Sequence, residues 1–332
     1  MPTTGTRSWI AAAIMGVALA LSAVCPSAHA QDWPTRTVKF LLPIGAGSGA
    51  DVGARLIAER LSARWGQPVV IENRPGGDGF VALTAFTNAH DDHLLLYAPA
   101  TTFAGHPFFY KKLPYDPAKD FTPVAMTSSV AFALAVNPSL PVHSIKELIQ
   151  YVKERPGQLS FGSTGIGATP HLAFEILMRE AGLKMTHVPY RGGGPAFQDV
   201  IAGRIDYFCS LAAAAMGALE SEQIKPIALL TGERSALFPA LKTAKELGFP
   251  GVDSYFWTAF FFPKDTPDEI VQKLYEATNR TLNSPVTVER LKKSGVTPIA
   301  AELRTPAYLK TFVGTEIANW AAQVKASGVA IE

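Results

Sequence analysis

The chain has 332 residues, of which 48% are hydrophobic and 17% charged, and its formal net charge at pH 7 is +2. A chain of this length is usually divided into two domains. The balanced charge, without a basic run or stripe, excludes proteins that hold nucleic acid or an anionic membrane on a broad positive surface.

The first 30 residues predict a secretory signal peptide. Arg7 supplies the positive start, residues 9–24 are almost entirely apolar, and Ala28-His29-Ala30 fits the small-residue cleavage pattern. We expect cleavage after Ala30, which removes Arg7 from the 30 basic residues and leaves 29 against 28 acidic ones. Cys25 leaves too, so the remaining Cys209 has no partner for an internal disulfide. A retained membrane anchor and a lipoprotein attached at Cys25 are the alternatives.

The first unit of the exported part is a strand, a glycine-rich loop and a helix. Val38–Leu42 is apolar and short, residues 43–49 hold three glycines, and Ala50–Trp65 repeats apolar residues at helical spacing. Such a junction presents free backbone N–H groups and the positive end of a helix dipole. It therefore predicts a site for an anion.

Strands and helices then alternate along the chain, which predicts a mainly parallel sheet with helices on both faces. The pattern restarts near residue 132, and Ser144 with Glu147 three residues later predicts a capping box for the helix that follows. The predicted strands are Pro68–Glu72, Leu94–Tyr97, Phe132–Val136, Leu159–Phe161, Lys184–Tyr190, Ile205–Cys209, Ile227–Leu230 and Tyr255–Phe262. The predicted helices are Phe80–Asn88, Ile145–Glu154, one that starts at Pro170, Pro267–Asn283 and Thr305–Ser327.

A second loop before a helix, residues 162–169, offers the hydroxyls of Ser163, Thr164 and Thr169. Pro170 stands where a first helical residue is expected. These hydroxyls either cap their own turn or contact a ligand. His171, at the start of the helix, either supports the site from behind or satisfies a local hydrogen bond. Two similar halves, each with such a loop, would face one another across a cleft.

The first loop also matches a dinucleotide-binding fingerprint. Residues 45–50 read G-x-G-x-x-A after a strand, and Glu72 ends the next strand. An exported protein rarely meets free nicotinamide cofactors, so a small-anion site is the preferred interpretation and purely structural glycines are the other alternative. Ser48 and Asp51 fit a capping box, which makes Asp51 a structural acid that holds the loop.

Catalytic and metal chemistry find little support in the sequence. The dense cluster of metal-ligand types, residues 90–93, lies in a polar turn before a strand, and a solvated turn is its simplest explanation. Neither glycine loop has the spacing of a nucleophile elbow, and no carboxylate pair suggests acid–base catalysis. We therefore predict no catalytic residue, no metal ligand and no cofactor.

Motifs in order along almost the whole exported chain resemble those of one known family. They are Trp33-Pro34-Thr35-Arg36, the loop 43–51, Gly66–Gly76, Tyr110–Pro117 with Lys119-Asp120-Phe121, Val136–Pro141, Phe161–Gly165, His187–Gly192 and Ile201–Arg204. The chain resembles the Bug-type solute receptors, which are the periplasmic binding components of tripartite tricarboxylate transporters.

The resemblance implies a two-domain α/β fold of the periplasmic-binding-protein type (type II-like, Venus flytrap) that closes on a small carboxylate in the interdomain cleft. Domain 1 would comprise residues 31–132 and 250–332, and domain 2 residues 133–249. The resemblance also implies a periplasmic monomer that needs no cofactor and delivers its ligand to membrane permease subunits, or, as in some members, to a signalling partner. The implied ligand-binding residues are Gly47, Ser48, Gly49, Ala50, Asp51, Ala98, Thr101, Ser163, Thr164, Ala168, Thr169 and Ser210.

One departure from the family bears on the ligand. Many members have an aspartate where this chain has Ser210, and its absence argues against an amino-acid ligand. The stretch 98–109, expected to be a loop, holds Phe103, His106, Phe108 and Phe109. These rings either contact an aromatic carboxylate or fill the interdomain core, and plain dicarboxylates remain open.

Overall fold

The computed structural model describes residues 33–46, 49–76, 79–190, 193–211, 217–219, 221–235, 238–293 and 296–329. The predicted signal peptide and the loop residues Gly47 and Ser48 lie outside these ranges. The chain divides into two compact units, residues 1–35 and 36–332, and the second contains every helix and strand described below. None of the helices among the described residues is long and apolar enough to cross a membrane.

Among the described residues, sheet A consists of five strands and the first part of β4, including the short strand β10 (Thr297–Pro298), which pairs with β4. Three strands at one edge are parallel: β1 (Val38–Leu42) lies between the edge strand β2 (Val69–Asn73) and β3 (Leu94–Pro99). On the other side of β3, β9 (Tyr255–Pro263) runs antiparallel. The helices that connect or follow these strands are α2 (Gly49–Trp65), α3 (Phe80–Thr87), α9 (Asp268–Leu282) and α10 (Pro285–Lys293).

A second group of strands forms sheet B. β5 (Ser160–Ser163) pairs in parallel with β6 (Thr186–Pro189) and with β7 (Tyr207–Leu211). β8 (Lys225–Leu229) joins the group by pairing with β4. Its helices are α5 (Ile145–Lys153), α6 (Thr169–Ala181) and α7 (Gly193–Ile201).

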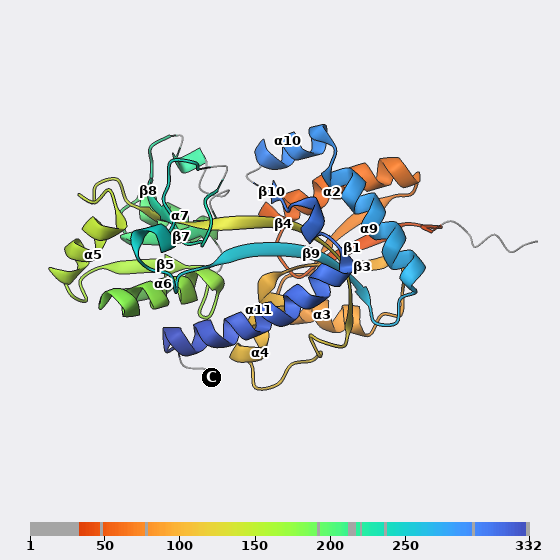
Figure 1. Ribbon diagram of the computed structural model, residues 1–332, viewed down its shortest axis with the longest axis horizontal. Coiled ribbons are helices and arrows are strands. Elements are labelled where there is room, and N and C mark those ends of the chain that lie inside the picture. The colour runs from red at the N-terminus through yellow and green to blue at the C-terminus, as the bar shows by residue number, and fades with distance from the viewer. Residues whose placement is uncertain are drawn as a thin grey trace, which may run out of the picture. The chain divides into compact units, whose positions relative to one another are not determined.

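The 16-residue strand β4 (Phe121–Val136) belongs to both sheets and makes them one continuous sheet, which has ten strands in the described part of the chain. It pairs antiparallel with β9 up to Ala131 and with β7 from Phe132 onward. Figure 1 shows β4 and β9 side by side in the middle of this sheet. The partner changes next to residue 132, where the sequence predicts a domain boundary; the division into domains stays a prediction.

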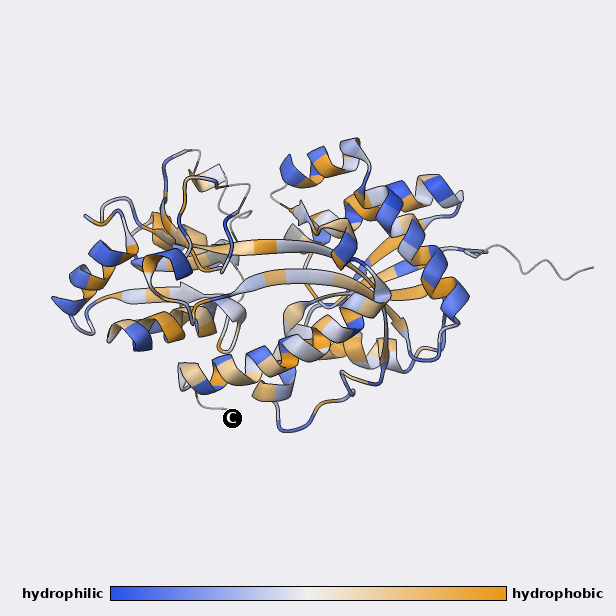
Figure 2. Cartoon of the chain, in the orientation of Figure 1, coloured by the Kyte–Doolittle hydropathy of each residue, from blue (hydrophilic) through white to orange (hydrophobic). Residues whose placement is uncertain are grey.

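Each sheet has its own hydrophobic core. On sheet A, Trp257 and Phe261 pack with residues of α3 and of α11 (Pro306–Ser327). On sheet B, Phe161 and Tyr207 pack with residues of α5 and α6. Figure 2 shows the corresponding pattern, with hydrophilic and hydrophobic residues interleaved along α5 and α9, as expected for helices that bury one side.

Several elements follow the sequence closely. The capping box is confirmed, because the Ser144 hydroxyl accepts a hydrogen bond from the backbone N–H of Glu147 at 3.2 Å. The α/β class is confirmed as well, but the prediction of a mainly parallel sheet is wrong at its centre, where β4 and β9 run antiparallel to their neighbours. The sequence did not predict α10 as a helix separate from α9.

The stretch 98–109 is not a loop. β3 continues to Pro99, and a π-helical turn, η2 (Thr101–Gly105), leads into the short helix α4 (His106–Phe109). The remaining short elements are η3 (Lys245–Leu247), β10 (Thr297–Pro298) and η4 (Ala301–Leu303).

Candidate functional site: two loop–helix junctions

The first junction runs from the end of β1 into α2. Gly45 and Ala46 are exposed, and Gly49 and Ala50 begin the helix, with Ala50 buried. The first turn of a helix has backbone N–H groups without partners in the helix, and the dipole makes this end positive. These general features favour an anion, and the site at this junction stays a prediction.

Asp51 is held by side chains that anchor the first loop. It is 2% exposed and accepts hydrogen bonds from Asn73 Nδ2 at 2.9 Å and from Arg55 Nε at 3.0 Å. The same Asn73 amide donates to the carbonyl oxygen of Ile44 at 3.1 Å. The Asp51 carboxylate thus ties the start of α2 to the end of β2 and to the loop, which supports the interpretation of Asp51 as a structural acid.

The second junction runs from β5 into α6, and its first hydroxyl is turned inward. Ser163 is fully buried, and its Oγ donates to the carbonyl oxygen of Gly165 at 2.9 Å and accepts from the Gly165 N–H at 3.2 Å. His187 Nε2 lies 2.7 Å from the same Oγ. Since the hydroxyl has a single proton, His187 Nε2 donates to it when that proton goes to the Gly165 carbonyl, and accepts from it otherwise. By contrast, Thr164 and Ile166 are exposed.

Two stacked histidines contact this loop and its neighbouring strand. His171 Nδ1 accepts a hydrogen bond from the Gly167 N–H at 2.9 Å, and its ring lies 3.9 Å from the ring of His187. Burial, and to a smaller extent the nearby His171, lower the pKa of His187 to about 4, although Glu175 acts in the opposite direction. Of the two roles considered for His171, the structure shows the local hydrogen bond.

The end of the second loop depends on a glycine. Gly167 has φ +75°, and a Cβ built on it would lie 2.6 Å from the Phe109 ring. Ala168 follows in extended conformation directly before α6, and Thr169, 4% exposed, begins the helix. Pro170 occupies the first turn, as the sequence predicts.

The remaining predicted site residues lie in or beside the cores. Ala98 is fully buried in β3, and Thr101, partly buried, begins η2. Ser210 pairs with Ala133 in the ladder between β7 and β4. The structure therefore brings together the residues within each junction, while Ala98 belongs to the core of sheet A.

The aromatic residues of 98–109 are engaged in packing. The Phe103 ring is fully buried and stacks on Phe261 with a centroid separation of 4.1 Å. Buried His106 shares a 2.8 Å hydrogen bond with the Tyr115 hydroxyl. Phe108 and Phe109 pack against a cluster that contains Trp320. For Phe103 and His106 these contacts support the role as core residues.

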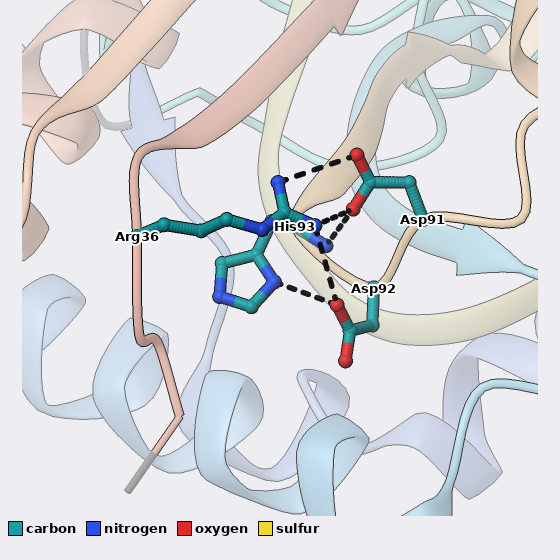
Figure 3. Close-up of polar contacts among 4 residues, drawn as sticks. All are labelled: Arg36, Asp91, Asp92 and His93. Carbon is teal, nitrogen blue, oxygen red and sulfur yellow. Dashed lines mark hydrogen bonds and ion pairs between the residues drawn. The ribbon is translucent and has the colours of Figure 1, made fainter. Parts of the chain in front are cut away.

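The polar turn before β3 forms an ion-pair network (Figure 3). Arg36 Nη2 lies 2.7 Å from Asp91 Oδ1 and 3.9 Å from Asp92 Oδ1. His93 Nδ1 lies 2.6 Å from Asp92 Oδ1. The arginine supplies the positive charge that a cation would otherwise bring, and both aspartates are partly exposed. This arrangement supports a solvated structural turn over a metal site.

Sequence reasoning missed the supporting residues Asn73, Arg55 and His187. Asn73 ends β2 directly beside the end of β1, since Leu42 pairs with Asn73. The sequence did contain a signal for Asn73, because a polar side chain ends the strand that follows β1 and the carboxyl ends of parallel strands lie at the same edge of a sheet. His187 is opposite Phe161 on β5, next to the loop, but a lone histidine in a strand does not reveal which hydroxyl it will contact.

Residues 53–329 match the family described as tripartite tricarboxylate transporter family receptor. Protein BugT of Bordetella pertussis (strain Tohama I) is 31% identical over 322 residues, which is 96% of this chain and 98% of BugT. The solved structure of R. palustris Rpa4515 with adipate has a TM-score of 0.83 and 34% identity, and covers 91% of this chain and 100% of that one. MatC (Rpa3494) from Rhodopseudomonas palustris with bound malate has a TM-score of 0.78 and 33% identity, covering 88% and 100%.

Proposed function

We propose a function from the family of the chain, which belongs to the tripartite tricarboxylate transporter receptors. Members of this family are solute-binding receptors rather than enzymes. In this proposal the protein captures a small organic carboxylate in the periplasm and delivers it to membrane permease subunits. Membership of this family argues against the alternative interpretation, a dinucleotide-dependent enzyme. Glu72, the acid which that alternative assigned to a ribose, accepts a hydrogen bond from Arg74 Nε at 2.6 Å.

The observation that carries the proposal is the pair of loop–helix junctions. One precedes α2 in sheet A and the other precedes α6 in sheet B, so each sheet contributes one helix N-terminus. A carboxylate that bridges the two would be bound best when the junctions approach, and ligand binding would favour closure. The residues proposed to form the site are Gly47, Ser48, Gly49, Ala50, Asp51, Ala98, Thr101, Ser163, Thr164, Ala168, Thr169 and Ser210.

The contacts of Asp51 and Ser163 indicate that these residues hold the loops in shape. Their oxygens are engaged with Asn73, Arg55 and His187, so we assign them the role of shaping the loops. The exposed Thr164 and the backbone N–H groups of the two helix starts would meet the carboxylate. The site would then bind the anion through neutral N–H and O–H donors, without a buried positive charge. Such a site can release its ligand to the permease.

Among carboxylates, the structure favours an aliphatic dicarboxylate over an aromatic acid. Two of the aromatic side chains considered for ligand contact, Phe103 and His106, are buried in the core of sheet A and its surroundings. Related structures contain adipate and malate, which are both aliphatic dicarboxylates. Adipate and malate are therefore the first compounds to test.

A thermal-shift screen of residues 31–332 tests the proposal. The panel contains adipate, malate, a tricarboxylate, benzoate, glutamate and NADH at pH 7. A ligand at about a hundred times its Kd stabilises the fold by about 2.7 kcal/mol, which is a visible rise in Tm. We expect a rise with a dicarboxylate. Stabilisation by NADH alone, or by no carboxylate at all, contradicts the proposal.

Delivery and export need separate tests. Deletion of the gene should abolish uptake of the identified carboxylate, whereas intact uptake with a lost transcriptional response would favour the signalling role. We also propose that export removes residues 1–30, and N-terminal sequencing of the secreted protein should then start at Gln31. An intact Arg7-containing N-terminus would show a retained anchor.

A further inference from the structure

The second loop is tied to its helix by a hydrogen bond that only a neutral histidine can accept. The backbone N–H of Gly167 donates to Nδ1 of His171 at 2.9 Å. Because a backbone N–H can only donate, Nδ1 is unprotonated, and the single proton of the neutral ring lies on Nε2. That Nε2 faces Glu175 Oε1 at 3.5 Å, one turn further along α6. The contact with Gly167 is therefore lost when His171 takes up a second proton.

The His171 ring has little room to turn away from such a change. It is 4% exposed, and it stacks on His187 of β6 with a centroid separation of 3.9 Å and on Phe161 of β5 at 6.2 Å. The loop has more freedom, since Thr164 and Ile166 near its tip are exposed. A proton on Nδ1 would set two donors against each other, and the loop rather than the ring would move.

Two titratable side chains contact His171 in the described part of the chain, and they direct the first proton to it. Glu175 of its own helix is a carboxylate that would pair with a charged His171 ring. Burial, and to a smaller extent His171 itself, lower the pKa of His187 to about 4, so His187 is neutral above pH 5. Two charged rings at the stacking distance would repel each other, so the pair takes up one proton first, on His171.

The other elements packed on α6 contribute groups that do not compete for this proton near neutral pH. β5 presents the Phe161 ring. On β7, burial raises the pKa of Tyr207 and of Cys209, so both stay neutral. On α11, the carboxylate of Glu316 lies in the wall of a cavity that includes Thr169, and it already accepts hydrogen bonds from neutral donors. His171 is thus the group that couples pH to the second loop.

We propose that His171 is a positioning residue for the second junction, and that its protonation weakens carboxylate binding by releasing the loop at Gly167. This rests on the proposed function, since residues 163–169 form one half of the proposed carboxylate site. A charged histidine near an anion site ordinarily strengthens binding, because it adds positive charge. Here Glu175 offsets that charge, whereas the lost hydrogen bond comes from the loop itself. The affinity for the carboxylate therefore falls as the pH is lowered.

NMR of the ligand-free exported protein tests the loop without any ligand. At pH 7.5 we expect the His171 ring to have a proton on Nε2 and none on Nδ1. Between pH 7.5 and 5 the amide signal of Gly167 should shift with the same midpoint as the His171 ring. A proton on Nδ1 at pH 7.5, or a Gly167 signal that does not follow the ring, would overturn the inference.

Calorimetric titration with adipate and with malate tests the link to binding. His171→Asn keeps an acceptor for the Gly167 N–H, the amide oxygen, but does not titrate. At pH 7.5 the variant should bind within about twofold of the wild type, and on lowering the pH to 5 the wild-type Kd should rise about tenfold more than that of the variant, which corresponds to one lost hydrogen bond. Protonation of the ligand itself affects both proteins equally and cancels in the comparison.

His143→Gln is the matched control, because His143 is exposed on the surface before α5, and its Kd should follow that of the wild type. The same pH dependence of Kd in the wild type and in His171→Asn would overturn the inference, as would an affinity that rises on acidification in the wild type alone. Absence of binding by both acids at pH 7.5 would instead contradict the proposed function, and the ligand-free NMR then decides whether His171 controls the loop.

Discussion

At the scale of single residues, buried polar side chains shape the two loops. Asp51 joins α2, β2 and the first loop through Asn73 and Arg55, and Ser163 joins the middle of the second loop to β6 through Gly165 and His187. Hydrogen bonds to such buried groups contribute modestly when present and cost more when one partner is lost. Their main effect is to hold each loop in the shape that presents its backbone N–H groups.

Asp51→Ala should destabilise the fold. The change leaves the Asn73 amide and the Arg55 guanidinium without their carboxylate partner, so we expect a loss of about 2–3 kcal/mol in urea unfolding. Glu59→Ala is the matched control: Glu59 pairs with Arg290 on the surface, and its removal should cost about 0–1 kcal/mol. Equal losses in the two variants would show that the Asp51 network does not hold the loop.

His187→Gln should reduce the pH dependence of stability. The folded-state pKa of His187 is lowered to about 4 from an ordinary value of 6.5, so between these values the unfolded state binds the proton more readily. The wild type therefore loses stability as the pH falls from 6.5 to 4. Glutamine keeps an Nε2 donor for Ser163 but does not titrate. The variant should therefore lose less stability than the wild type between pH 6.5 and 4.

Thermal denaturation across pH 7 to 4 measures this difference. His143→Gln is the control, because His143 is exposed on the surface before α5. Its pH dependence of Tm should follow that of the wild type. A His187→Gln curve parallel to the wild-type curve would contradict the assigned environment of His187.

At the scale of secondary-structure elements, the second junction depends on close contact with α4. Gly167→Ala introduces a side chain at positive φ and a Cβ against the Phe109 ring, so we expect a loss of about 2 kcal/mol or more and weaker carboxylate binding. Gly194→Ala, in α7, meets open space and should be neutral or stabilising. Calorimetric unfolding of both variants decides the matter, and a neutral Gly167→Ala would contradict the described loop.

The elements that the sequence predicts well are those with a strong local signal. α5 has its capping box, and β1 is a short apolar run before glycines. The first part of β4 was not predicted, because Thr127 and Ser128 interrupt its apolar pattern. In the structure both are buried and share hydrogen bonds with Thr258 of β9, a contact between segments 130 residues apart. Such a distant partner leaves no local signal.

In the candidate site, too, some features follow from local sequence and others depend on distant partners. Loop positions, helix starts and Pro170 follow from local sequence, and the family resemblance orders them along the chain. The inward turn of Ser163 and the stack of His171 on His187 depend on how β5, β6 and α6 pack. The sequence leaves open whether Phe103 contacts the ligand or fills the core. Its stacking on Phe261 of β9 supports the core role.

At the scale of the whole molecule, β4 joins sheet A to sheet B, and its partner changes from β9 to β7 between Ala131 and Phe132. The helix α11 packs with α6 as well as with η2. The closure proposed above would therefore have to be accommodated by β4 and the other segments that join the two sheets. A carboxylate held by only one junction would give no such coupling.

A crystal structure of the protein with the dicarboxylate found in the thermal-shift screen tests the central claim most directly. We expect one carboxylate group of the ligand to lie within about 3 Å of backbone N–H groups from both junctions, residues 47–51 and 163–169. A ligand bound elsewhere, or held by one junction alone, would contradict it.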